Sequence, residues 1–187
     1  MTPIIELKEI CKSFPGVQAL SDVCFDVFPG EVHALLGENG AGKSTLIKII
    51  SGVYEPDAGS IDIHGESVRF ANPLDAQSAG IATIYQELLL FPDLTVAENI
   101  FMGHPPRNRL GGVDWPTMRR KAVDLLKSLD IHDLEPTEVV GTLSIGNRQR
   151  VEIAKALSRD ARLLIMDEPT AALTEADALR LFDIVRR

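Results

Sequence analysis

The sequence predicts an α/β fold, in which a β-rich part is interrupted by a helical one, and three observations carry that prediction. First, the run Gly37–Thr45 fits the pattern G-x-x-x-x-G-K-[ST] between the strand-like Val32–Leu36 and the apolar start of a helix at Leu46–Ile50. Second, Leu163–Met166 is an uninterrupted apolar run, which is typical of a strand covered on both faces of a parallel sheet. Third, from about residue 91 to residue 160 the apolar spacing becomes helical.

The remaining elements follow from periodicity and turn residues. Ile4–Ile10 and Val23–Phe28 alternate apolar and polar residues, and the second run stops at Pro29-Gly30. Shorter strands are expected at Gly59–His64 and Ile81–Tyr85. The change of pattern along the chain predicts three segments: a β-rich core (1–89), a helical subdomain (90–159) and a return to the core (160–187).

Helical spacing marks Thr95–Met102 and Pro116–Leu129, separated by a loop at Gly103–Gly112 that is rich in glycine and proline. Ser144 is expected to cap a helix that ends near Ser158. A last helix is expected from Glu175 onward.

The glycine run predicts phosphate binding. Glycines let the backbone turn its N–H groups toward a phosphate, and the following helix adds its positive N-terminal end. Lys43 would reach the β- and γ-phosphates, and the Ser44 hydroxyl would hold Mg²⁺. The alternative is a glycine-rich turn beside a solvated lysine, but chance matches at ordinary residue frequencies are expected below about 1% over this length. The expected nucleotide contacts are Gly37, Asn39, Gly40, Gly42, Lys43, Ser44 and Thr45.

Charge and composition narrow the function classes. Nineteen basic against 27 acidic residues give a net charge of −8, which argues against a broad nucleic-acid or anionic-membrane surface. No apolar run approaches the roughly 20 residues that span a bilayer, and the N-terminus lacks a signal-peptide pattern. Two cysteines are too few for a disulfide framework. These features favour a cytoplasmic protein.

Two further motifs carry chemistry. Asp167 and Glu168 end the apolar strand at 163–166, where the first would orient Mg²⁺ through water and the second would polarise a water that attacks the γ-phosphorus. The alternative is an ordinary pair of acids that ends a strand. Leu143–Gln149 opens a helix with a serine and a glycine, which is either a second phosphate-binding helix end or an ordinary N-cap.

On these residues the chain resembles the ATP-binding subunit of an ABC transporter over essentially all 187 residues. The glycine loop matches the Walker A motif, Leu143–Gln149 the signature motif and Leu163–Glu168 the Walker B strand. The resemblance implies a P-loop NTPase with a RecA-like parallel sheet, an antiparallel β subdomain and an inserted helical subdomain. It also implies that Gln86 contacts Mg²⁺ and the attacking water, that Phe14 stacks on adenine unless it is a core residue, and that Asp167 serves the metal. Ser144, Gly146 and Gln149 would contact ATP held by a partner cassette.

Four segments are similar to monosaccharide importers of the ribose, galactose and xylose type: Phe14–Leu20, Gly37–Gly42, Gln86–Leu88 and Val151–Leu157. In those importers one polypeptide carries two cassettes, and this chain resembles the first. The resemblance implies a second cassette, membrane permease subunits and indirectly a periplasmic sugar-binding protein as partners, with no nucleic acid, at the cytoplasmic face of the cell membrane. The rival interpretations are a nucleotide-binding module without turnover and a soluble ABC ATPase.

The chain departs from the family at three places. Ile145 replaces a glycine, and Asn147 stands where glutamine is usual. The family's switch histidine has no counterpart, because it follows the helix that begins near Glu175, and His33, His64, His104 and His132 all lie upstream. The resemblance therefore implies a C-terminally truncated cassette that binds ATP and hydrolyses it poorly.

Overall fold

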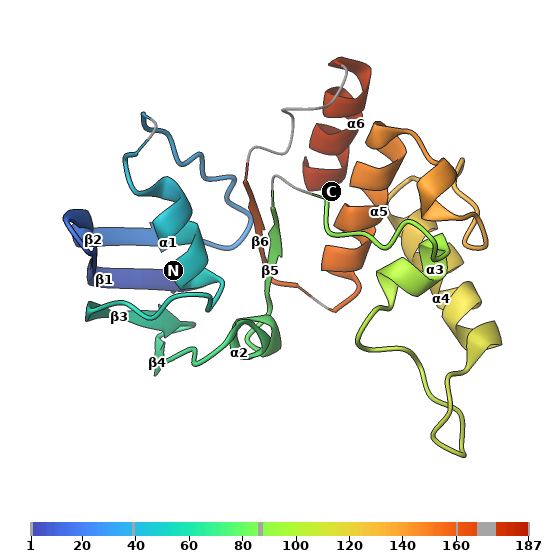
Figure 1. Ribbon diagram of the computed structural model, residues 1–187, viewed down its shortest axis with the longest axis horizontal. Helices are drawn as coiled ribbons and strands as arrows, with labels where there is room; N and C mark the ends of the chain where they lie inside the picture. The colour runs from blue at the N-terminus through green and yellow to red at the C-terminus, as the bar shows by residue number, and fades with distance from the viewer. Residues whose placement is uncertain (1, 39, 86–87, 160, 168–174, 187) are drawn as a thin grey trace. The chain divides into compact units, whose positions relative to one another are not determined.

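The computed structural model describes the chain except for residues 1, 39, 86–87, 160, 168–174 and 187. It divides into two compact units (Figure 1). The first contains residues 1–83 and 161–165, and the second contains residues 84–160 and 166–187. Each unit is described by itself below.

The first unit is built on a four-stranded antiparallel sheet in the order β2-β1-β3-β4. Its strands are β1 (Ile5–Phe14), β2 (Val17–Val27), β3 (Ala58–Ile63) and β4 (Glu66–Val68). Ile5 and Leu7 alternate with the exposed Lys8 and are almost fully buried, and Ile10 joins the same buried face because a register shift between Leu7 and Ile10 interrupts the alternation. This confirms the antiparallel β subdomain.

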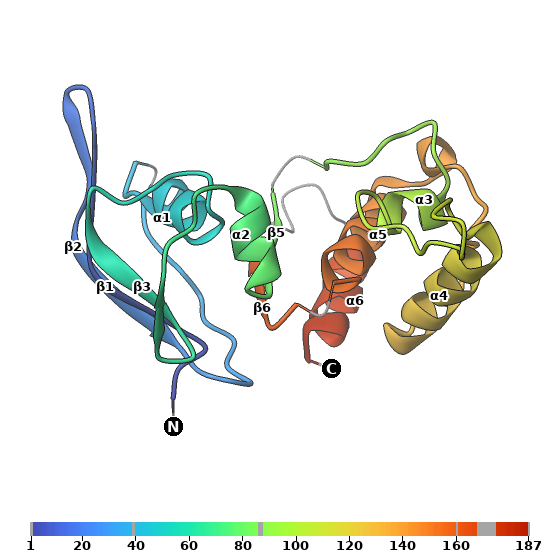
Figure 2. The same cartoon turned by 90° about the horizontal axis from the view of Figure 1, so that it is seen from below.

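Helix α1 (Lys43–Ile50) lies against this sheet (Figure 2). Its buried residues Leu46 and Ile49 belong to the same apolar core as the inner face of β1 and β3. Helix α2 (Pro73–Ser78) begins at Asn72, whose side-chain oxygen accepts hydrogen bonds from the N–H groups of Leu74 and Asp75. The core of the first unit therefore holds the start of α1 in a defined place.

A second sheet pairs β5 (Ile81–Ile84) with β6 (Leu163–Met166). The N–H of Leu163 donates to the carbonyl of Gly80 (3.1 Å) and the N–H of Asp167 to that of Ile84 (2.9 Å). Both strands thus advance in the same direction, which confirms a parallel pair. Residues 163–166 are half-buried rather than covered on both faces.

The predicted strand at Val32–Leu36 is wrong: this segment has no regular secondary structure, and Val32 and Leu36 are 77% and 88% exposed. An apolar run becomes a strand only where its N–H and C=O groups find a neighbouring backbone. Within the described part of the chain, neither sheet contains a strand paired with this segment. The local sequence therefore shows apolar residues typical of a strand, but it does not show whether a neighbouring strand pairs with them.

The second unit is helical. It contains α3 (Val96–Ile100), α4 (Trp115–Ser128), α5 (Ile145–Leu157) and α6 (Glu175–Arg186), with a 3₁₀ turn at Val140–Thr142. These helices confirm the expected helical stretches. Thr95 and Glu98 form a reciprocal cap at the start of α3, and Val96, Ile100, Ala122, Leu126 and Val151 build the core. Among the described residues, no helix combines the length and apolar character that crossing a bilayer requires.

Candidate functional site

The glycine loop lies in the first unit, directly before α1. Gly40 and Gly42 both adopt positive φ, +86° and +84°, a region that side chains with a Cβ rarely enter. The N–H of Ala41 donates to the carbonyl of Glu38 (3.2 Å), which closes a tight turn inside the loop. Gly37 and Gly40 are exposed. The described part of the loop therefore has the backbone conformations that the glycine pattern predicts.

Gly42 fixes the loop to the sheet. A Cβ at this position would lie 2.5 Å from the carbonyl oxygen of Ala19 and 2.8 Å from Cδ2 of Leu20, both on β2. Only a residue without a side chain permits this approach. The start of α1 is consequently held against the antiparallel sheet by a close contact that does not accommodate a Cβ atom at residue 42.

Lys43 turns back onto its own loop. Its Nζ donates to the carbonyl oxygens of Gly37 (2.5 Å) and Glu38 (2.9 Å). An ammonium group has three protons to donate. Among the described residues, these two contacts hold the charge at the loop and leave one N–H of Lys43 for an anionic oxygen.

The N-terminus of α1 fits a phosphate. Its N-cap, Gly42, provides no side-chain acceptor, and the first turn contains no acidic residue, so the free N–H groups of this helix end keep their positive potential. Ser44 is exposed and Thr45 is half-buried. Their hydroxyl oxygens are the hard donors that Mg²⁺ prefers. The donor set thus fits a magnesium-bound phosphate.

Phe14 ends β1 at a hairpin tip, where about a third of its surface is exposed. Its ring lies edge-on to Tyr54 with 5.4 Å between centroids, and Nζ of Lys48 on α1 lies 5.5 Å from the Tyr54 ring. The Asp57 carboxylate accepts from Nζ of Lys12 (2.6 Å) and from the N–H of Ser13 (2.7 Å). These contacts join the hairpin tip to the region around α1. No sequence motif pointed to Tyr54 or Asp57.

The predicted metal and catalytic positions are only partly described. Asp167 follows β6 and is half-buried, with its N–H bonded to the carbonyl of Ile84 at the end of β5. The prediction that it ends a parallel strand is confirmed. Asn39, Gln86 and Glu168 lie outside the described residues.

The signature segment lies in the second unit at the start of α5. Ser144 is its N-cap, and its Oγ accepts a hydrogen bond from the N–H of Asn147 (3.2 Å). The predicted helix from Ser144 to about Ser158 is confirmed. Ser144 is exposed and Gly146 is buried. Gln149, a proposed nucleotide contact, is only 7% exposed in this structure.

The unusual Asn147 has an internal partner. Its side-chain oxygen accepts from the guanidinium of Arg150, which also binds both oxygens of Asp133 at 2.7 Å. Arg148 donates to the carbonyl of Gly141 (2.8 Å). The polar side chains after Ser144 therefore tie α5 to the segment that precedes it.

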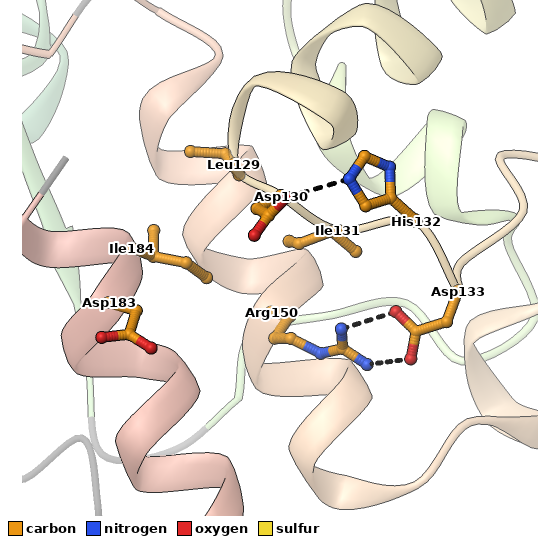
Figure 3. Close-up of a pocket in the computed structure, with 8 residues that line it drawn as sticks. All are labelled: Leu129, Asp130, Ile131, His132, Asp133, Arg150, Asp183 and Ile184. Carbon is orange, nitrogen blue, oxygen red and sulfur yellow. Dashed lines mark hydrogen bonds and ion pairs between the residues drawn. The ribbon is translucent and has the colours of Figure 1, made fainter.

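A pocket of about 480 Å³ lies beside this network (Figure 3). It is lined by Leu129, Asp130, Ile131, His132, Asp133, Arg150, Asp183 and Ile184, none of which is a predicted site residue. An ion pair joins Arg150 to Asp133, and Nε2 of His132 lies at hydrogen-bond distance, 2.9 Å, from Oδ1 of Asp130. Most of the charged lining is thus held by contacts within the unit, and we assign the pocket no role in nucleotide binding.

Sequence reasoning also missed a buried pair on α5. Glu152 is buried, and Lys155 lies 3.4 Å from its Oε1 while donating to the carbonyl of Leu89 (2.6 Å). Oε2 of Glu152 has no hydrogen-bond partner among the described residues. Burial raises the pKa of the Glu152 carboxyl, and the attraction of Lys155 only partly opposes this.

We expect Glu152→Gln to stabilise the protein at neutral pH by about 1 kcal/mol, because it removes a buried charge whose desolvation is incompletely compensated. A raised folded-state pKa makes the wild type lose stability as pH rises through that pKa. The advantage of the variant should therefore shrink as pH falls toward 4.5, the ordinary pKa of a glutamate. Urea unfolding across this pH range, with the exposed Glu135→Gln as control, measures it. A constant difference at all pH values would contradict the assignment.

The comparisons with known proteins agree with this geometry. The profile of the ABC transporter family matches residues 20–171. The ribose import ATP-binding protein RbsA 1 of Rubrobacter xylanophilus is 56% identical over the whole chain, which covers 37% of that protein. RbsA 2 of Streptomyces avermitilis is 55% identical over 98% of the chain and 36% of that protein. The chain thus spans little more than a third of these relatives.

Among solved structures, the ADP conformation of MJ1267, an ATP-binding cassette of an ABC transporter, superposes with a TM-score of 0.85 at 28% identity over 100% of this chain and 76% of that one. A nucleotide-free ATP-binding cassette from an ABC transporter gives 0.83 at 29% identity, over 98% and 76%. The phosphate loop, the parallel β5–β6 pair, the antiparallel sheet and the helical unit are thus those of a P-loop NTPase cassette, and the chain belongs to the ABC transporter family.

Proposed function

We propose that this chain is the ATP-binding cassette of a sugar importer, which couples Mg-ATP binding and hydrolysis to monosaccharide transport. The observation that carries the proposal is the loop before α1, where, among the described residues, Lys43 keeps one N–H to donate and no acidic or capping side chain lies at the helix N-terminus. The relatives are ribose import ATP-binding proteins, which supports the transport class.

In this proposal each set of side chains has a separate task. Phe14 stacks on the base, and the loop residues Gly37, Asn39, Gly40, Gly42, Lys43, Ser44 and Thr45 bind the phosphates. Ser44, Gln86 and Asp167 would hold Mg²⁺, which when bound neutralises charge on the phosphates. Glu168 accepts the proton of the attacking water while Gln86 orients that water.

The second unit would serve a neighbouring nucleotide. Ser144 is exposed at the N-terminus of α5, a helix end suited to an anion. We propose that Ser144, Gly146 and Gln149 bind ATP held by a second cassette. Because Gln149 is buried here, its contact with that ATP requires α5 to rearrange in the dimer.

The proposed partners are that second cassette, membrane permease subunits and, indirectly, a periplasmic sugar-binding protein. Relatives almost three times as long as this chain are compatible with a polypeptide that carries two cassettes, of which this is the first. The proposed location is peripheral, at the cytoplasmic face of the membrane. No nucleic acid is expected to take part.

We also propose that the chain by itself hydrolyses ATP slowly. Each of its four histidines contacts a neighbour away from the glycine loop: His33 with Glu31, His64 with Arg162, His104 with Ser158 and His132 with Asp130. In this proposal none of these four histidines serves as the γ-phosphate contact that the family resemblance implies. Phosphate release measured beside ATP binding separates a slow enzyme from a binding module, and turnover at an ordinary rate of roughly 10 s⁻¹ would contradict this part of the proposal.

Lys43→Ala tests nucleotide binding. Loss of a charge-assisted contact worth roughly 1.5–3 kcal/mol should weaken ATP binding about tenfold to a hundredfold. The matched control is Lys48→Ala, which removes a lysine from the same helix but leaves the contacts to Gly37 and Glu38. Titration with a fluorescent ATP analogue measures both variants. Unchanged affinity in Lys43→Ala would refute the phosphate-loop assignment.

A further inference from the structure

A local excess of positive charge interrupts this acidic chain between α3 and α4. Residues 107–121 contain five basic side chains and one acidic one, whereas the whole chain has a net charge of −8. The five basic residues are all exposed: Arg107, Arg109, Arg119, Arg120 and Lys121. The net charge of the whole chain argues against a broad basic surface, but it does not reveal this small basic segment.

The segment before α4 is an ordered hairpin. The N–H of Asn108 donates to the carbonyl of Gly112 (2.8 Å), and the N–H of Asp114 donates to that of Pro106 (2.9 Å). The side-chain oxygen of Asn108 accepts from the N–H groups of Leu110 and Gly112, each at 3.0 Å. Figure 1 shows this loop extending beyond the helices of its own unit. The hairpin therefore has internal bonds that set its conformation.

This hairpin presents an apolar residue. Leu110 at its tip is 96% exposed, although exposing a leucine brings no stability to the unit. Trp115, which begins α4, is 47% exposed and lies one helical turn before Arg119, on the same side of the helix. Leu110 directly follows Arg109 in the hairpin, and Trp115 lies beside Arg119 on α4, so each exposed apolar residue has an arginine as its neighbour along its own segment.

Two acidic side chains, Glu98 near Arg119 and Asp114 near Arg120, offset part of this charge but leave the basic side chains in excess. Asp114 caps α4, and its carboxylate accepts from the N–H (3.1 Å) and the hydroxyl (2.8 Å) of Thr117. These bonds lower the pKa of Asp114, and they direct its oxygens toward the helix start. Nη1 of Arg107 donates to the carbonyl of Gly111 (2.7 Å), which leaves its other N–H groups to bind an anion.

We propose that the hairpin face, defined by Arg107, Arg109, Leu110, Trp115 and Arg119, binds the surface of an anionic lipid bilayer. Arginines would contact the phosphate headgroups, Leu110 would enter the acyl boundary, and Trp115 would lie at the interface that tryptophan prefers. Each basic residue near such a surface raises the partition coefficient about fivefold. Charges elsewhere on the acidic chain are screened beyond about 8 Å at physiological salt. The face would give this chain a direct membrane contact independent of nucleotide.

Vesicle binding tests the proposal. Trp115 is the only tryptophan in the chain, so its fluorescence reports on the hairpin face alone. Vesicles of phosphatidylcholine with phosphatidylglycerol should shift Trp115 emission to shorter wavelength and should sediment the protein. Vesicles of phosphatidylcholine alone should do neither, and added salt should release the protein from the anionic ones. Absence of binding to anionic vesicles, or equal binding to neutral ones, would overturn the proposal.

The double variant Arg109→Ser with Leu110→Ser should bind anionic vesicles about tenfold more weakly. Its matched control is Arg69→Ser with Leu74→Ser, which removes an exposed arginine and an exposed leucine from the first unit. Circular dichroism and the thermal midpoint confirm that both variants fold. Equal losses in the two variants would overturn the assignment to the hairpin face. So would wild-type binding to a fluorescent RNA oligonucleotide without a response to vesicles.

Discussion

Gly42→Ala is expected to lower the free energy of unfolding by about 2–5 kcal/mol. A non-glycine residue at φ +84° costs roughly 1–2 kcal/mol. The added Cβ would also lie 2.5 Å from the carbonyl oxygen of Ala19, and relieving such an overlap typically costs about 1–3 kcal/mol. Because the loop and the start of α1 must move to relieve it, ATP binding should be lost as well. Urea unfolding and titration with a fluorescent ATP analogue measure the two effects.

Gly40→Ala is the matched control in the same loop. Gly40 has nearly the same φ, +86°, but a Cβ there would meet nothing within 4 Å. It should therefore show only the backbone cost of roughly 1–2 kcal/mol. The difference between the two variants isolates the contact between the loop and β2. If both lose the same stability, that contact does not hold the loop.

Glu168→Gln should reduce ATP hydrolysis by about 10²–10⁴-fold and leave ATP binding nearly unchanged. The amide keeps the size of the side chain but cannot accept the proton of the attacking water, and general-base catalysis contributes a factor of this order. ATP that persists in the closed site should also make a dimer easier to detect. Single-turnover measurement of ADP, with protein in excess, resolves the rate even where turnover is slow.

Glu175→Gln, an exposed glutamate at the start of α6, is the control for a change of charge in the same region. It should hydrolyse ATP at the wild-type rate. A wild-type rate in Glu168→Gln would exclude Glu168 as the catalytic carboxylate. Weakened ATP binding in that variant would assign it to the metal site instead.

Elements with a strong local signal could be predicted from the sequence. Ser144 marked the start of α5 because an N-cap needs only a hydroxyl and the next three residues. The apolar run 163–166 indicated β6, and the alternation from Ile4 to Ile10 indicated the buried face of β1. The glycine pattern predicted the positive φ angles at Gly40 and Gly42, since no other residue tolerates them as readily.

The sequence by itself thus determined the family motifs, the helices of the second unit and the glycine conformations of the loop before α1. The tertiary structure alone decided that Val32–Leu36 is unpaired, that Gln149 is buried and that Asn147 binds Arg150. It also decided that Gly42 packs on Ala19 and that Glu152 is a buried carboxylate with an unpaired oxygen. Caps and turns depend on neighbours within a few residues, whereas strand pairing, burial and side-chain partners depend on residues that only folding brings together.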